Sequence, residues 1–286
     1  MTSVRVERRS MISSRTLRLT FIVLAGLFMA VPIYLLVVNA FKPQAEIIST
    51  PFGFDLSTLS FDYMARALTS TRFNVVAAYG VTIALVIGVN IISLIVSVPA
   101  AYVIARSLKR RYRVLMLILL AGLFIPGQAL IIPGIYVLKS LGLMGTIQGF
   151  LLFETTLTIP VSIFLYVGYI QTIPRELDEA AKIDGAGQLR TLVSVIAPLM
   201  KPAIATAIVL HSIGVWSDFV HPQMILGPAS GIYTVTTGIY AAISQYTSDY
   251  TLVYPNLLLA VAPILIFFVF MQRKIVGGLT SGALKG

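Results

Sequence analysis

The chain has 286 residues, of which 57% are hydrophobic and only 11% are charged. Soluble domains carry about a quarter charged residues, so this balance excludes an ordinary soluble protein and indicates an integral membrane protein. The absence of cysteine excludes disulfides and thiolate chemistry, and the two histidines, His211 and His221, cannot build a metal site alone. The formal net charge is +10, so the positions of the basic residues decide between nucleic-acid binding and membrane topology.

Six apolar stretches are long enough to cross a bilayer as helices, which requires about 20 residues each. The first follows a basic segment, but it is long and lacks a small-residue cleavage site, so we interpret it as an uncleaved span. The predicted fold is therefore an all-α integral membrane protein with six transmembrane helices. It comprises a cytoplasmic segment, 1–18, and one transmembrane domain, 19–286. The predicted spans are 19–41, 75–105, 114–138, 147–170, 203–227 and 254–272.

The basic residues predict the orientation of these spans. With the N-terminus in the cytoplasm, the inner segments are 1–18, 106–113, 171–202 and 273–286. This distribution follows the positive-inside rule, so both termini are predicted to be cytoplasmic and no nucleic-acid partner is expected. Of the 21 Lys and Arg residues, the inner segments hold all except Lys42, Arg66, Arg72 and Lys139.

The two long segments on the opposite side are 42–73 and 228–255. FDYMARAL at 61–68 predicts a short surface helix in the first. The second is rich in tyrosine, which we interpret as interfacial anchoring, with a partner-binding surface as the alternative. Proline interrupts three of the spans, which favours helices that line a cavity or pack on neighbours. The prolines are Pro126, Pro133, Pro160 and Pro263.

Polar side chains inside the fourth and fifth spans mark a candidate translocation path. Glu154 lies about two turns into the fourth span, and Asp218 lies in the fifth near the single tryptophan, Trp216. An ionisable group inside a span is costly unless it faces water or a partner, which makes it a functional candidate. The alternatives are an interior hydrogen bond or a position near the lipid headgroups.

The inner segment 171–202 contains a helix of soluble character, RELDEAAKIDGAG at 175–187. Pro174 fits the first turn, and the carboxylates that follow lie where the helix dipole favours negative charge. Gly185 predicts a stop and a corner with positive φ, after which QLRTLVSVIAPL forms a second helix. Ala181 and Gly185 share a face that another protein can approach closely. A solvated loop helix is the alternative interpretation.

EAAKIDGAG followed by IAPLMKP resembles the EAA signature of the membrane subunits of binding-protein-dependent ABC importers. AAYVIARSLKRR, SIGVWSDFVHP and QRKIVGGLTSGALKG resemble the maltose-type sugar permeases, and nearly the whole chain from the first span follows that plan. The departures are small. Val193 and Val195 stand where a bulkier or aromatic residue is common, and Ala197 stands where leucine often precedes the proline, which affects the packing of the docking helix.

The resemblance implies a type I importer permease fold in the cytoplasmic membrane of a bacterium or archaeon. It implies four protein partners, namely a homologous second permease, two ATP-binding subunits and an extracytoplasmic sugar-binding protein, together with membrane lipid around the spans. In that family the short helix is a coupling helix seated in the ATPase subunit, so 171–202 is the coupling loop and the tail 273–286 lies against the ATPase dimer. Carried over, the docking residues are Glu179, Ala180, Ala181, Asp184 and Gly185, and the tail contacts are Gly282, Lys285 and Gly286.

Several other functions are disfavoured. The sequence has no GxxxxGK(S/T) phosphate loop, so we expect no ATPase site, catalytic residue, metal or cofactor in this chain. GAGQLR lacks the third glycine of a dinucleotide fingerprint. His211 and Ser212 are adjacent on a helix and point in different directions, which disfavours a hydrolase triad with Asp218.

Sugar import is the predicted function. A permease for a polyol or glycerophosphate is the alternative within the class, and an ion-coupled secondary transporter or a channel is the alternative outside it.

Overall fold

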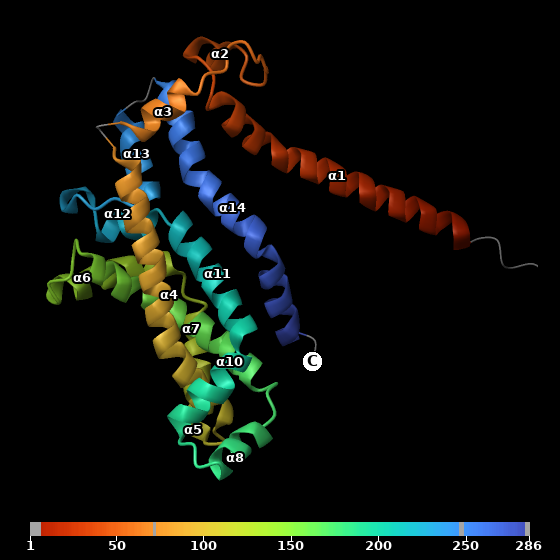
Figure 1. Ribbon diagram of the computed structural model, residues 1–286, viewed down its shortest axis with the longest axis vertical. Coiled ribbons are helices and arrows are strands. Elements are labelled where there is room, and N and C mark those ends of the chain that lie inside the picture. Colours follow the sequence, from red (N-terminus) through yellow and green to blue (C-terminus); the bar gives the residue numbers. More distant parts are fainter. Residues whose placement is uncertain (1–6, 71–72, 246–248, 284–286) are drawn as a thin grey trace, which may run out of the picture. The chain divides into compact units, whose positions relative to one another are not determined.

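The computed structural model describes residues 7–70, 73–245 and 249–283, and for 7–14, 244–245 and 273–283 it describes the backbone alone. Within these ranges every regular element is a helix, which confirms the predicted all-α class (Figure 1). The elements are α1 (Glu7–Asn39), α2 (Gln44–Ser49), α3 (Asp62–Leu68), α4 (Val75–Arg106), α5 (Arg110–Gly122), η1 (Gly127–Leu130), α6 (Ile131–Ser140), α7 (Ile147–Ile170), α8 (Glu176–Ile183), α9 (Gln188–Thr191), η2 (Leu192–Ile196), α10 (Ala197–Leu199), α11 (Lys201–Ser217), α12 (Val220–Ile225), η3 (Pro228–Ser230), α13 (Val235–Gln245) and α14 (Tyr250–Ala283).

Four helices in the described chain are long and apolar enough to cross a membrane. They are α4, α7 and the stretches Arg15–Asn39 of α1 and Tyr250–Gln272 of α14. Two bent helix pairs raise the number to six if each pair is one span. The first pair is α5 with η1 and α6, bent by 95°, and the second is α9–α10 with α11, bent by 76°. The described residues therefore offer four to six spans, in the regions that the sequence predicted.

The bent pairs correct the predicted third and fifth spans. The third, 114–138, is not a continuous helix, because α5 ends at Gly122 and Pro126 is the N-cap of η1. Proline lacks an amide hydrogen and disfavours helical backbone at the residue before it, which explains the break. The fifth, 203–227, ends early: α11 stops at Ser217, Asp218 has extended backbone, and the short helix α12 follows.

The chain divides into two compact units. The first contains residues 1–71 and 242–259, with α1, α2, α3 and the start of α14. The surface helix predicted at 61–68 is confirmed there as α3. The second contains residues 72–241 and 260–286, with α4 to α12, the rest of α14 and most of α13, whose last residues, 242–245, belong to the first unit. The sixth predicted span ended at 272, whereas helical backbone continues to Ala283.

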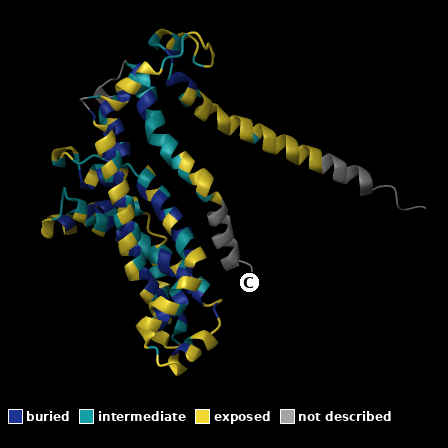
Figure 2. Cartoon of the chain, in the orientation of Figure 1, coloured by how far each residue is buried: buried dark blue, intermediate teal, exposed yellow. Residues whose placement is uncertain are grey.

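The second unit is built on α4, α7 and α11, which contact one another (Figure 1). One apolar cluster joins these helices to η2, and another joins them to α6 and α12. Hydrogen bonds between polar side chains also cross the helix interfaces, as is common in membrane bundles. Ser162 Oγ lies 3.1 Å from both Ser93 Oγ and His211 Nε2, and Asn90 Nδ2 donates to Ser212 Oγ at 3.2 Å. Figure 2 shows that the buried residues of α4, α7 and α11 alternate with exposed ones.

Candidate functional sites: the short helix α8 and a buried polar cluster

The predicted short helix is present as α8, and its ends follow the expected helix chemistry. Three carboxylates lie in its first turn and Lys182 lies in its last, which is the charge order that the helix dipole favours. Gly185 follows the C-cap with φ +78°, as predicted. The N–H of Ala186 donates to the carbonyl of Ala181 at 2.9 Å, and that of Gly185 donates to Lys182 at 3.1 Å. These two bonds form a Schellman motif, which explains why α8 stops here.

A single acidic residue, Asp178, attaches α8 to the ends of α4 and α7. Its Oδ2 lies 2.8 Å from Arg106 Nη2, and its Oδ1 accepts a hydrogen bond from Tyr102 at 2.6 Å. Arg106 Nη1 also donates to the carbonyls of Ile170 and Ile173, at 3.2 and 3.1 Å. The paired side chains are only 14% and 19% exposed, so water screens the attraction little. We call Tyr102, Arg106 and Asp178 the α8 joint.

The sequence did not predict the α8 joint. By position alone, Asp178 is one of the charges that stabilise a helix dipole, and Arg106 is one of several inner basic residues. Arginine suits the junction because its guanidinium is always charged and presents five donors in a fixed plane. Here it binds a carboxylate and two backbone carbonyls at once. The only sequence signal was a pair of opposite charges far apart in the chain, and such a pair has many possible partners.

Four of the five predicted docking residues are exposed on α8 and its corner: Glu179, Ala180, Asp184 and Gly185. Ala181 is different, because it is only 8% exposed and α8 contacts α9 and η2. On the expected shared face, a partner can therefore reach Gly185 but not Ala181. A Cβ added to Gly185 meets nothing within 4 Å, so this position is unpacked within the chain.

The predicted tail contacts fall at the C-terminal edge of the described chain. Gly282 lies on the helical backbone of α14. Lys285 and Gly286 lie outside the described residues.

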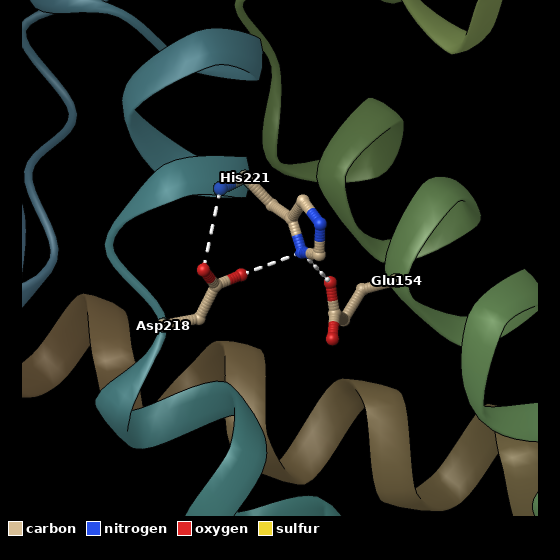
Figure 3. Close-up of side chains that lie close together, drawn as sticks. All are labelled: Glu154, Asp218 and His221. Carbon is tan, nitrogen blue, oxygen red and sulfur yellow. Dashed lines mark hydrogen bonds and ion pairs between the residues drawn. The ribbon is translucent and has the colours of Figure 1, made fainter. Parts of the chain in front are cut away.

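The candidate path residues Glu154 and Asp218 meet at His221 (Figure 3). His221 Nδ1 lies 2.7 Å from Asp218 Oδ2 and 3.0 Å from Glu154 Oε2. A nitrogen this close to two carboxylates carries a hydrogen, which both carboxylates share. The ligand atoms that these three side chains offer lie within 4.8 Å of one another, a spacing that also suits a cation. We call these three residues the histidine cluster.

Asp218 also accepts hydrogen bonds from the backbone where the chain turns from α11 into α12. Its Oδ1 accepts hydrogen bonds from the backbone N–H groups of Val220 at 2.9 Å and His221 at 3.3 Å. An aspartate in this position caps the first turn of a helix, and the capped helix here is α12. Asp218 thus follows the end of α11, and its side chain both caps the start of α12 and holds His221.

The histidine cluster is enclosed by neighbouring elements. Glu154 and His221 are each 8% exposed. The ring of Phe153 lies against His221 edge to face, with centroids 5.2 Å apart. A Cβ added to Gly127 would lie 3.5 Å from Cε1 and Nε2 of the same ring, so η1 also packs against it. The cluster therefore joins α7 and α12 at the bend between α5 and α6.

From the sequence, His211 and His221 could not build a metal site alone, and the role of His221 was not predicted. The available signal was the spacing DFVH, in which an aspartate precedes a histidine by three residues at a helix start. Trp216, the third candidate path residue, has other partners. Its ring stacks on Tyr79 with centroids 6.0 Å apart, and its Nε1 donates to the carbonyl of Ala260 at 3.1 Å.

Both sites lie within a region of the chain that matches a known protein family. The family described as "Binding-protein-dependent transport system inner membrane component" matches residues 97–276, which include both the α8 joint and the histidine cluster. The chain belongs to this family of membrane transport components. It is 32% identical to the multiple sugar-binding transport system permease protein MsmG of Streptococcus mutans, over 91% of this chain and 93% of that protein. It is 27% identical to the diacetylchitobiose uptake system permease protein NgcG of Streptomyces coelicolor, over 92% of this chain and 87% of the relative.

Solved structures show the same fold. A chain of a bacterial ABC transporter involved in the import of the acidic polysaccharide alginate matches with a TM-score of 0.74 at 23% identity. The match covers 95% of this chain and 99% of that one. A chain of the inward-facing MetNI methionine ABC transporter matches with a TM-score of 0.51 at 18% identity, over 69% and 93% of the two chains. At these identities the likeness establishes the transporter fold.

Proposed function

We propose that this chain is the permease subunit of an ABC importer that carries a sugar, an oligosaccharide or related carbohydrate, into the cytoplasm. The observation that carries the proposal is the 32% identity to a sugar-transport permease along nearly the full length of both chains. The relatives named for diacetylchitobiose and starch degradation products support the same substrate class. A polyol or a glycerophosphate is the alternative substrate.

The proposed topology has six spans, with both termini and α8 in the cytoplasm of a bacterium or archaeon. The concentration of basic residues in the predicted inner segments supports this orientation. The proposed partners are a homologous second permease, two ATP-binding subunits and an extracytoplasmic sugar-binding protein. The surface of α8 seats in an ATP-binding subunit, and the tail residues Gly282, Lys285 and Gly286 contact the ATPase dimer.

The α8 joint gives this proposal a mechanism. ATP binding closes the partner subunits and displaces α8. Because Asp178 is bonded to Tyr102 and Arg106, displacement of α8 moves the C-terminal end of α4. Arg106 also donates to the carbonyl of Ile170, so the C-terminal end of α7 moves with it. From Ile170 to Glu154, α7 is a continuous helix of about 24 Å at about 1.5 Å per residue. The motion therefore reaches the histidine cluster at the far part of α7 and, through it, α12.

The contacts of the candidate path residues favour structural roles. Glu154 and Asp218 are engaged by His221, and Trp216 donates to a backbone carbonyl. We propose that these side chains shape the wall of the pathway and that interior hydrogen bonds account for their presence inside the spans. The chain supplies no catalytic residue, and hydrolysis takes place in the partner subunits.

Purification from membranes tests the proposal. The tagged chain should recover a second permease and two ATP-binding subunits, and ATP hydrolysis by this complex in liposomes should rise on adding sugar-loaded binding protein. A preparation freed of the ATP-binding subunits should hydrolyse none. Transport driven by an ion gradient in the chain alone would contradict the proposal and favour a secondary transporter.

A further inference from the structure

Residues 41–61, which follow α1, form a compact lobe in the first unit. Its base is closed: the N–H of Ser60 donates to the carbonyl of Phe41 at 2.8 Å, and the rings of Phe41 and Phe61 meet edge to face at 5.0 Å. Inside it, Thr58 Oγ1 donates to Glu46 Oε2 at 2.8 Å. Despite these internal bonds, five large apolar side chains of the lobe are between 59% and 79% exposed. They are Ile48, Phe52, Phe54, Leu56 and Phe61.

The length of α1 indicates where this lobe lies in a membrane. No charged residue occurs between Arg18 and Asn39. At about 1.5 Å per residue this uncharged helical stretch is about 30 Å long, which matches the hydrocarbon core of a bilayer. Arg18 and Asn39 therefore mark the two boundaries of the hydrocarbon.

The lobe folds back along the end of α1, past the boundary at Asn39. Asn39 Nδ2 donates to the carbonyl of Pro51 at 3.1 Å, and Tyr34 Oη donates to that of Phe52 at 2.9 Å. Tyr34 precedes Asn39 by five residues, which is about 7 Å along the helix towards the bilayer centre. Side chains on a helix also lean towards its N-terminus. Phe52 consequently lies beside the last turns of the span, on the hydrocarbon side of the boundary.

Three carbonyls in this part of the lobe are bonded within the chain, as hydrocarbon requires of the polar groups that it surrounds. Three successive carbonyls accept hydrogen bonds from side chains: Thr50 from Lys42 Nζ at 2.9 Å, Pro51 from Asn39, and Phe52 from Tyr34. Lys42 and Asn39 are only 1% and 0% exposed, so the bonds that they donate are shielded from water, whereas the bond from Tyr34 lies at the surface of the chain. In hydrocarbon an unbonded carbonyl is costly, whereas water would satisfy the carbonyls of an aqueous loop without such partners.

We propose that the lobe is a membrane anchor whose Phe52 and Phe54 insert into the acyl chains of the leaflet at the C-terminal end of α1. The bilayer is the partner because the exposed side chains lie at the depth of the span and adjoin α1, whose residues 15–37 are mostly exposed (Figure 2) and largely apolar. A soluble binding protein or the second permease could also cover this surface, and the experiment separates the three. The inference needs only that α1 crosses the membrane, and it is independent of the transported substrate.

Site-directed spin labelling tests the anchor. The chain has no cysteine, so the parent complex in liposomes gives the background from its partners. Nitroxides are placed at Phe52→Cys and Phe54→Cys, with Ser57→Cys as the control on an exposed polar turn that is bonded to Asp55. Collision rates are measured with oxygen, which concentrates in lipid, and with a water-soluble nickel chelate.

We expect oxygen collisions to exceed nickel collisions severalfold at positions 52 and 54, and the ratio to reverse at position 57. Frequent collision with nickel at 52 and 54 would place the lobe in water, open to a soluble partner. Protection from both reagents would place it against another protein chain. Either outcome overturns the proposal.

Discussion

The α8 joint and the histidine cluster lie towards opposite ends of α7 and hold their neighbours in different ways. The joint binds a carboxylate and two backbone carbonyls to one guanidinium, and most of α8 beyond it remains exposed. The histidine cluster shares one ring nitrogen between two carboxylates and is enclosed by Phe153 and Gly127. We propose from this difference that the joint transmits force from a partner subunit, whereas the cluster fixes the shape of the chain around a bend.

The largest effect is expected from Arg106→Ala, which breaks the α8 joint. Asp178 would keep a largely buried charge without its partner, and removing one member of such a pair costs about 3 kcal/mol. We expect the protein to insert at the parent level but to lose at least ten-fold in sugar-stimulated ATP hydrolysis. The matched control is Arg113→Ala, which removes an exposed inner arginine. Parent-like coupling in Arg106→Ala would show that α8 moves the spans by another route.

His221→Ala should reveal the contrast between the two sites. It leaves the carboxylates of Glu154 and Asp218 without the shared donor, in a buried position, at a cost of about 2–3 kcal/mol. The melting temperature of the detergent-solubilised complex should fall by several degrees, and uptake should fall in proportion to the folded protein. Glu154→Gln keeps an acceptor for Nδ1 and should lose much less. An unchanged melting temperature with lost uptake would instead assign the cluster a direct role in transport.

Gly185→Val tests the corner that presents α8 to its partner. Valine at φ +78° is strained by about 1–3 kcal/mol, while the open space at this position adds no packing penalty within the chain. We expect normal insertion with reduced pull-down of ATP-binding subunits and reduced sugar-stimulated turnover. Gly185→Asn is the control, since asparagine tolerates this backbone conformation. Equal loss in both variants would show that the partner, and not the backbone, excludes side chains here.

The smallest effect on folding is expected from Glu179→Lys. The residue is exposed in the first turn of α8, so losing its interaction with the helix dipole costs less than about 1 kcal/mol. Any loss of sugar-stimulated hydrolysis at a parent-like melting temperature would therefore report the docking surface. Normal stability together with normal stimulation would remove Glu179 from that surface.

The sequence predicted the features that depend on local chemistry. Long apolar runs located the candidate spans, the carboxylates of RELDEAA placed the start of α8, and Gly185 placed its end with the correct sign of φ. The assignment to an importer family followed from residues within and around that helix and is confirmed.

The sequence did not predict features that depend on distant contacts. Asp178 meets Arg106, and Glu154 meets His221, across long intervening stretches, and one sequence offers many equivalent charge pairs. Pro126 signalled an interruption, but the 95° bend depends on how the following helix packs. Likewise, the burial of Ala181 depends on elements after the corner, so the small-residue face alone suggested a partner surface.

Photocrosslinking from α8 tests the central claim, that this helix is the point at which an ATP-binding subunit acts on the chain. A photoreactive residue is placed at Ala180 and, as the control, at Ser57 in the lobe; both residues are exposed, and the proposed topology puts them on opposite sides of the membrane. In membranes that contain the assembled complex, we predict a covalent adduct between position 180 and an ATP-binding subunit, with none from position 57. A complex that hydrolyses ATP normally but yields no such adduct from position 180 would contradict the account.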